Sequence, residues 1–180
     1  QGEESRKIAN GFRVVLSGRT NVGKSSIMNY LSGEERAIVS QIHGTTRDII
    51  ETELNLKGYP VLLIDSAGIR DKVENEIEAY GILKAKEESA RADLIVYILD
   101  AQTGKTEEDQ AILKTLCHEK TLLCYNKVDL LREKIPLPLA VSAKTGEGMD
   151  LLKENIIARL NLKNMEEVAF YLNLRQNEVL

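Results

Sequence analysis

Short apolar runs alternate with polar, glycine-containing segments along most of the chain. The runs that predict buried strands span residues 12–16, 60–64, 94–99, 121–125 and, more briefly, 137–141. Residues 50–56 alternate apolar and polar positions, and Lys57-Gly58 joins them to residues 60–64, which predicts an antiparallel hairpin. Helical spacing of apolar residues covers residues 24–31, 77–90, 107–116, 150–160 and 165–180. This alternation predicts an α/β fold, with a mostly parallel six-stranded sheet and helices on both faces.

The composition is typical of one globular domain. The chain has 180 residues, of which 43% are hydrophobic and 29% are charged. Its formal net charge of −4 argues against binding nucleic acid through bulk positive charge. No apolar run approaches the length of a membrane span, and two cysteines do not make a disulfide framework. We therefore expect a cytoplasmic protein without membrane contact, and the start at Gln1 suggests a piece of a longer chain.

A glycine-bearing loop between the first predicted strand and helix carries the most specific motif. Gly18-Arg19-Thr20-Asn21-Val22-Gly23-Lys24-Ser25 matches the phosphate-loop pattern G-x-x-x-x-G-K-[ST]. Its glycines let backbone N–H groups point at phosphate oxygens, at the positive end of a helix. We expect Lys24 to reach the β- and γ-phosphates and the Ser25 hydroxyl to bind Mg²⁺. The alternative, a glycine turn that only caps a helix, is disfavoured by the strand–loop–helix context.

Two later segments predict which base is bound. Asn126-Lys127-Val128-Asp129 directly follows a predicted strand, and a carboxylate at Asp129 can accept from both N1–H and the exocyclic amine of guanine. We expect Asn126 to connect this loop to the phosphate loop and the stem of Lys127 to cover a ring face. Ser142-Ala143-Lys144 follows the last short apolar run, where the Ala143 N–H can meet guanine O6. The order of these segments behind a phosphate loop predicts guanine.

Two further segments are candidates for sensing the γ-phosphate. Asp65-Ser66-Ala67-Gly68 closes the strand at 60–64, where Asp65 would hold Mg²⁺ through water and the Gly68 N–H would face the γ-phosphate. Gly44-Thr45-Thr46-Arg47-Asp48 precedes the strand at 50–56, and we favour Thr46 over Thr45 as the second Mg²⁺ ligand. Ile69 stands where a Ras-like enzyme has its water-orienting glutamine, so another polar group must act. Spacing alone does not rank the nearby carboxylates Asp71, Glu74, Glu76 and Glu78.

The amino-acid sequences of these segments resemble those of one family of GTPases. Residues 36–40 (RAIVS) run into Gly44–Asp48 (GTTRD), and residues 65–70 (DSAGIR) are followed by residues 77–82 (IEAYGI). Over roughly residues 10–160, this pattern resembles the G domain of the MnmE family (also called TrmE), which are tRNA-modification GTPases of the translation-factor-related class. The related Der and Era GTPases share the phosphate loop and parts of the other segments. Ser66 and Thr20 stand where the family commonly has Thr and Pro.

The resemblance implies a Ras-like P-loop GTPase in which residues 11–161 form the G domain. Residues 1–10 would then be a leading flank, and 162–180 a trailing helix toward a helical domain outside this chain. MnmE proteins are dimers that act with their partner MnmG on the wobble uridine of certain tRNAs, and we expect the full-length protein to share these partners. Because its flanking domains are absent, we expect this chain to hydrolyse GTP to GDP and phosphate without modifying tRNA alone.

The resemblance also implies a catalytic group and a second metal ion. Glu78 matches the family's catalytic glutamate, and K⁺ would be held by Asn21 together with Ser40, Ile42 and Thr45, when two G domains dimerise. Arg47 remains a weaker candidate for neutralising charge in cis. The residues expected to contact GTP are Asn21, Val22, Gly23, Lys24, Ser25, Ser26, Ser40, Gln41, Ile42, His43, Gly44, Thr45, Thr46, Asp65, Ser66, Ala67, Gly68, Asn126, Lys127, Val128, Asp129, Ser142, Ala143 and Lys144.

A second function stays open from the sequence alone. A GTPase switch of the Der or Era type, which recruits a partner in ribosome assembly, uses the same phosphate and base motifs. His43 is more simply interpreted as an exposed loop residue, although it lies in the predicted nucleotide-contacting segment. Cys117, His118 and Cys124 lack the spacing of a zinc site. Glu107, Glu108 and Asp109 fit the first turn of a helix, where carboxylates suit the helix dipole.

Overall fold

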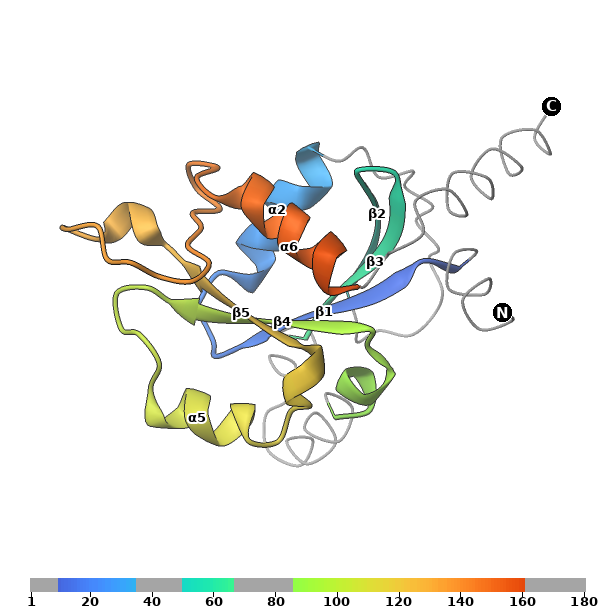
Figure 1. The fold of residues 1–180 in the computed structure, drawn as a ribbon, viewed down its shortest axis with the longest axis horizontal. Coiled ribbons are helices and arrows are strands. Elements are labelled where there is room, and N and C mark those ends of the chain that lie inside the picture. The colour runs from blue at the N-terminus through green and yellow to red at the C-terminus, as the bar shows by residue number, and fades with distance from the viewer. Residues whose placement is uncertain (1–9, 35–49, 67–85, 161–180) are drawn as a thin grey trace.

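The computed structural model describes residues 10–34, 50–66 and 86–160 (Figure 1). Its strands are β1 (Phe12–Gly18), β2 (Ile50–Leu56), β3 (Tyr59–Asp65), β4 (Leu94–Asp100) and β5 (Thr121–Asn126). Its helices are α2 (Lys24–Glu34), α5 (Glu107–Leu113) and α6 (Met149–Arg159), with short 3-10 turns η1 (His118–Lys120) and η2 (Val128–Leu130). The five strands lie within one or two residues of the predicted ranges, so the apolar pattern located them well.

The sheet has the order β2-β3-β1-β4-β5. β1 pairs in parallel with both β3 and β4, and β4 pairs in parallel with β5. β2 is the one antiparallel strand of this sheet and forms the predicted hairpin with β3. Lys57 and Gly58 both have positive φ, at 50° and 94°, as a type I′ hairpin turn requires. The mostly parallel α/β architecture is therefore confirmed.

The prediction of a sixth strand at residues 137–141 was wrong. This segment makes a single parallel bridge, between Tyr125 and Ala140. The Tyr125 N–H donates to Leu139 O and the Val141 N–H donates to Tyr125 O, both at 2.8 Å. Pro136 and Pro138 lie just before the bridge, and proline is uncommon inside a continuous strand. The described part of the chain thus has a sheet of five strands.

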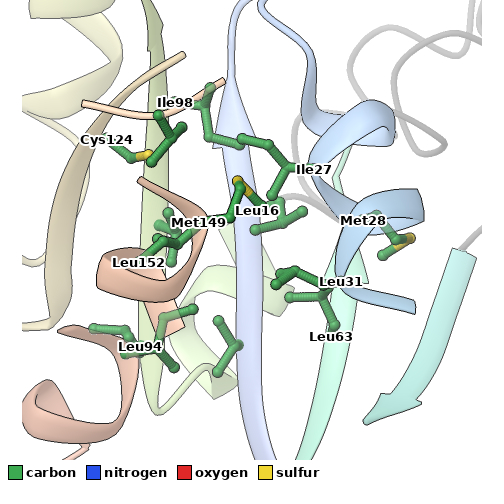
Figure 2. Close-up of a cluster of buried hydrophobic side chains, with 14 of the residues drawn as sticks. Leu16, Ile27, Met28, Leu31, Leu63, Leu94, Ile98, Cys124, Met149 and Leu152 are labelled. Carbon is green, nitrogen blue, oxygen red and sulfur yellow. The ribbon is translucent and has the colours of Figure 1, made fainter. Parts of the chain in front are cut away.

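Helices cover both faces of the sheet. Figure 1 shows α2 and α6 side by side over one face and α5 on the opposite side. The larger core lies beneath α2 and α6, and Figure 2 shows the converging side chains: Leu16, Ile27, Met28, Leu31, Leu63, Leu94, Ile98, Cys124, Met149 and Leu152. A smaller cluster of Val15, Ile64, Ala92 and Ile95 packs on the other face. Because β1 and β4 are covered on both sides, their sequences are almost continuously apolar.

The helices deviate more from the sequence pattern than the strands. α5 begins after Thr106, whose side chain caps the Asp109 N–H, but it ends at Leu113, three residues earlier than predicted. The predicted helix at 77–90 is described only in its last part, as helix over residues 86–91, and residues 165–180 lie outside the described residues. None of the helices within the described ranges combines the length and apolar character needed to cross a bilayer.

Candidate functional site

The predicted site residues gather at the carboxyl edge of the parallel strands. β1 ends at Gly18, β3 at Asp65 and β5 at Asn126. The register places Leu16 beside Asp65 and Asp100 beside Asn126, so these strands end at about the same level. In open α/β sheets, ligands bind in the crevice outside the carboxyl ends of the strands. The fold therefore brings the phosphate loop, the end of β3 and the base segments to one edge.

The backbone of the phosphate loop requires its glycines. Gly18 has a φ of 144°, and a Cβ there would lie 2.4 Å from Ile98 O of the neighbouring strand. Gly23 has a φ of 99°, and its Cβ would lie 2.2 Å from Nδ2 of Asn126. Asn21 is exposed and also adopts a positive φ, of 63°, which asparagine tolerates better than most residues. The loop is thus curled against β4 and the end of β5.

Lys24 lies buried at the start of α2 and points back into the loop. Its ammonium donates to Gly18 O at 3.0 Å and to Arg19 O at 2.6 Å. Lys24 is only 5% exposed, so hydrogen bonds to these backbone carbonyls of the phosphate loop stabilise its buried positive charge. This places one positive charge at the centre of the candidate phosphate site.

Two oxygen-bearing side chains from different elements meet beside the loop. The Ser25 hydroxyl, at the start of α2, donates to Oδ2 of Asp65 at 3.0 Å. Asp65 is buried at the end of β3, and the next residue, Ser66, donates its N–H to Leu16 O of β1. Ser26 is exposed on the first turn of α2. The hydroxyl and carboxylate are hard oxygen donors of the kind Mg²⁺ prefers.

Asn126 connects three segments that are far apart in sequence. Its Nδ2 donates to Val22 O of the phosphate loop at 2.9 Å, and its Oδ1 accepts from the Ala143 N–H at 3.2 Å. Asn126 is 2% exposed, so both contacts are shielded from water. The Ala143 N–H, which the sequence assigned to guanine O6, is in this structure a donor to Asn126.

Lys127 extends the link between the base segment and the phosphate loop. The residue adopts a left-handed conformation, with φ 67°, and its ammonium donates to Asn21 O and to Oδ2 of Asp100, the latter at 2.9 Å. Burial would by itself raise the pKa of the Asp100 carboxyl, but hydrogen bonds from Lys127 and the Gln102 N–H hold that pKa below its usual value. Asp100 therefore stays ionised and fixes the Lys127 side chain. No feature of the sequence had singled it out.

The side chain of Asp129 is oriented by the neighbouring segment. The Ser142 hydroxyl donates to Oδ1 of Asp129 at 2.7 Å and accepts from the Thr145 N–H at 3.1 Å. The Val128 N–H donates to Val141 O, so backbone contacts also hold the two segments together. Asp129 is partly exposed and Lys144 is exposed. The structure thus places the carboxylate predicted to recognise guanine at the open side of the base segment.

Several predicted residues lie outside the described residues. They are Ser40, Gln41, Ile42, His43, Gly44, Thr45, Thr46, Ala67, Gly68 and Glu78. The predictions of the second Mg²⁺ ligand, of three of the four K⁺ ligands and of the catalytic glutamate therefore remain predictions. Arg47 and Ile69 fall in the same ranges.

The sequence interpretation missed a buried contact behind the phosphate loop. Asp109 was assigned to an ordinary first helical turn, but its carboxylate is fully buried and accepts from Nε of Arg19 at 3.0 and 3.1 Å. The T-x-x-D spacing of Thr106 and Asp109 signals a capping box, but nothing in it indicates a partner 90 residues away. Only the fold brings Arg19 to α5.

Comparison with known proteins identifies the family to which this site belongs. Residues 13–127 match the profile of the family described as 50S ribosome-binding GTPase. The tRNA modification GTPase MnmE of Magnetococcus marinus is 42% identical over 188 residues, which include 99% of this chain and 40% of that protein. MnmE of Aquifex aeolicus is 40% identical, over 96% of this chain and 40% of that protein. The chain thus spans about two fifths of the length of these relatives.

Solved structures share the fold. Aquifex aeolicus Era bound to GDP and AlF4⁻ superposes with a TM-score of 0.64 at 25% identity, over 82% of this chain and 56% of that one. The cytosolic domain of the T. maritima FeoB iron transporter gives a TM-score of 0.62 at 27% identity, over 86% of this chain and 65% of that one. In this chain the phosphate loop, Asp65 and the base segment lie at the carboxyl edge of the sheet, where open α/β folds bind ligands. The chain therefore belongs to the 50S ribosome-binding GTPase family, as a Ras-like GTP-hydrolysing domain of the MnmE type.

Proposed function

We propose that this chain binds GTP along the carboxyl edge of its sheet and hydrolyses it as the G domain of a tRNA-modifying protein. The observation that carries the proposal is the buried Asn126 side chain, which contacts both Val22 O and the Ala143 N–H. It joins the phosphate loop to the two base segments in a single rigid unit. A site that must hold a triphosphate and a base at once needs such a link, whereas a capping turn does not.

The described residues support a division of roles. Lys24 supplies a buried ammonium at the loop, where charge on the β- and γ-phosphates must be neutralised. Asp129 would accept two hydrogen bonds from guanine, and Ser142 orients its carboxylate at 2.7 Å. Val128 and Lys144 would line the base with backbone and side-chain stem. Gly23, Ser26 and Ser66 would contribute backbone N–H groups or hydroxyls around the phosphates.

The residues at the loop fit a bound Mg²⁺ ion. The Ser25 hydroxyl and the Asp65 carboxylate lie 3.0 Å apart, and their oxygens are the ligands that Mg²⁺ accepts directly or through water. We propose Ser25 and Thr46 as protein ligands, with Asp65 acting through water. When bound, Mg²⁺ would neutralise negative charge on the β- and γ-phosphates.

A monovalent cation would supply the remaining positive charge. Asn21 fits because its side chain is exposed on the phosphate loop while its backbone oxygen is already held by Lys127. The side-chain amide oxygen, which takes no part in that contact, would be the ligand. We propose K⁺ as the ion, with Ser40, Ile42 and Thr45 as further ligands and with dimerisation of two G domains completing the site. The neutralisation of transition-state charge is usually the largest catalytic contribution.

We further propose Glu78 as the group that orients the attacking water. Ile69 has an aliphatic side chain and cannot do so. Such positioning contributes about 10²–10⁴-fold in rate. Glu78→Ala should therefore keep GTP affinity and K⁺-dependent dimerisation but lose most turnover, while Glu74→Ala and Glu76→Ala serve as matched controls.

One experiment tests the K⁺-activated GTPase as a whole. GTP turnover by the purified chain is measured in KCl and in NaCl at matched ionic strength, with no other protein added. Faster turnover in KCl, lost in Asn21→Ala, supports the proposal. Equal rates in both salts, or undiminished K⁺ stimulation in Asn21→Ala, would contradict the role of K⁺.

The role in tRNA modification rests on the named relatives. MnmE relatives match over nearly all of this chain, but the chain spans 40% of their length. We propose that residues 11–161 form the G domain, with 1–10 and 162–180 as flanks toward further domains. In the full-length protein this domain would act with MnmG on the tRNA wobble uridine, in the cytoplasm.

A second function is favoured by other observations. The matching profile is described as ribosome-binding, and Era is among the similar structures. A Der- or Era-like switch in ribosome assembly would hydrolyse GTP slowly alone and faster with a ribosomal partner. Rapid turnover in K⁺ without any partner separates the first function from the second.

A further inference from the structure

The side chain of Arg19 points out of the phosphate loop toward α5. Its Nε lies 3.1 and 3.0 Å from Oδ1 and Oδ2 of Asp109, and its Nη2 donates to the Thr103 hydroxyl at 3.0 Å. The Arg19 side chain is 20% exposed and that of Asp109 is fully buried. The positive charge of Arg19, a residue of the phosphate loop, is therefore paired with a carboxylate of the protein and is not directed at the nucleotide site.

Asp109 is held by partners on every side. Oδ1 also accepts from the Tyr97 hydroxyl at 3.0 Å, and Oδ2 accepts from the N–H and the hydroxyl of Thr106 at 2.9 and 2.8 Å. Burial would by itself raise the pKa of this carboxyl, but the hydrogen bonds from Thr106, Tyr97 and Arg19 hold its pKa below the usual value. The carboxylate is therefore ionised and immobile. It is a fixed point on α5, held also by Tyr97 of β4, to which Arg19 of the phosphate loop is attached.

Arg19 connects Asp109 to Lys24, the lysine of the phosphate loop. The carbonyl of Arg19 accepts from Nζ of Lys24 at 2.6 Å, while its guanidinium contacts Asp109. Gly18 O accepts from the same ammonium at 3.0 Å. Any rotation of the peptide at Arg19 therefore moves an acceptor of Lys24 as well. The contact with Asp109 restricts the Arg19 residue, whose carbonyl is one of the two acceptors of the Lys24 ammonium.

We propose that Asp109 is a positioning residue for the phosphate loop, which acts through Arg19 to preorganise the loop and Lys24 for the nucleotide phosphates. The inference rests on the proposed binding of GTP at this edge. A loop already held in its binding conformation loses less conformational freedom when a nucleotide arrives. The gain applies to both GDP and GTP, because both carry the β-phosphate that the loop and Lys24 are proposed to contact. It changes affinity and not the chemical step.

A second buried arginine–carboxylate pair in the same chain provides a matched control. Nη2 of Arg13 lies 2.6 Å from Oε2 of Glu88, whose side chain is 6% exposed. Arg13 lies at the opposite end of β1 from the phosphate loop. Replacing Glu88 removes one carboxylate from a comparable buried pair without touching the loop.

The experiment is a titration of the chain with fluorescent GDP and with a non-hydrolysable fluorescent GTP analogue. We expect Asp109→Asn and Arg19→Ala each to weaken both nucleotides by about tenfold, with the double variant no weaker than the worse single one. kcat at saturating GTP should stay within about twofold, while KM rises. Glu88→Gln should lower the unfolding temperature comparably and leave both affinities unchanged.

The outcomes separate this inference from the function on which it rests. Wild-type protein that binds neither nucleotide would overturn the proposed function. Wild-type binding with unchanged affinity in Arg19→Ala would overturn the positioning role alone, and Arg19→Ala keeps the test valid if Asp109→Asn does not fold. Additive losses in the double variant, or an equal loss in Glu88→Gln, would also overturn it, because either shows general destabilisation.

Discussion

The two ends of the candidate site are built in different ways. The phosphate end is one continuous segment, in which β1, the loop and the start of α2 supply Lys24 and Ser25. The base end is assembled from the segment after β5 and the segment around Ser142, which are joined by side-chain and backbone hydrogen bonds. Asn126 is the shared part, because it contacts Val22 O on one side and the Ala143 N–H on the other.

The difference shows where affinity and specificity reside. The phosphate end concentrates its charge on one buried ammonium, so it should dominate the binding energy of any nucleoside triphosphate. The base end has the single carboxylate of Asp129, which distinguishes guanine from other bases. Substitutions at the phosphate end should therefore weaken all nucleotides, and those at the base end should mainly change which nucleotide is preferred.

The largest effect is expected from Lys24→Met. Methionine has a similar length but removes the ammonium, and it leaves Gly18 O and Arg19 O without their donor. Charge-assisted hydrogen bonds contribute roughly 1.5–3 kcal/mol each, so GTP affinity should fall by about 10³-fold or more. Equilibrium titration measures this, and Lys105→Met, at an exposed position, should be neutral. A loss confined to GTP, with GDP binding intact, would contradict a role at both phosphates.

Asp129→Asn should give the clearest change of specificity. The amide keeps the size of the side chain but replaces one acceptor oxygen with a donor, so one of the two hydrogen bonds from guanine is lost and two donors face each other. We expect GTP affinity to fall by about 10²–10³-fold and xanthosine triphosphate, with a carbonyl at C2, to bind better than GTP. Competition titration measures the ratio, and Asp150→Asn, at an exposed position of α6, is the control. Equal losses for both nucleotides would show that Asp129 acts only on stability.

These expectations also show what the sequence could predict. The phosphate loop and the strands were predictable because each is contiguous and its residue types are dictated by local geometry, as with the positive φ of Gly18 and Gly23. The sixth strand was mispredicted because the apolar residues at 137–141 resemble a strand, while the segment pairs with β5 only through a single bridge. The contact of Arg19 with Asp109 was missed because it joins residues 90 apart, and no local pattern records that.

Gly23→Ala should affect both ends together, through Asn126. An added Cβ would lie 2.2 Å from Asn126 Nδ2, and φ at this position is 99°, which strains any other residue. Because Asn126 must move, its contacts with Val22 O and the Ala143 N–H are disturbed, and we expect a loss of about 10–100-fold in GTP affinity. Gly104→Ala is the matched control, with φ 66° and no atom within 4 Å of the added Cβ. If both variants lose affinity equally, backbone strain and not the contact with Asn126 is responsible.

The smallest effect is expected from Ser142→Ala, which removes the support of Asp129 and keeps the carboxylate itself. The hydroxyl donates to Asp129 Oδ1 at 2.7 Å and accepts from the Thr145 N–H at 3.1 Å, so its loss frees the carboxylate to rotate. A net hydrogen bond contributes about 0.5–1.5 kcal/mol, which corresponds to roughly 3–10-fold in GTP affinity. Preference for GTP over ATP should fall by the same factor, since only the base contact is weakened. Competition titration compares Ser142→Ala with Ser32→Ala and isolates the effect. The Ser32 hydroxyl donates to Met28 O within α2, so its loss removes a hydrogen bond away from the base. If Ser142→Ala weakened ATP and GTP alike, the Ser142 segment would serve the phosphate end through Asn126, and the division between the two ends would have to be redrawn.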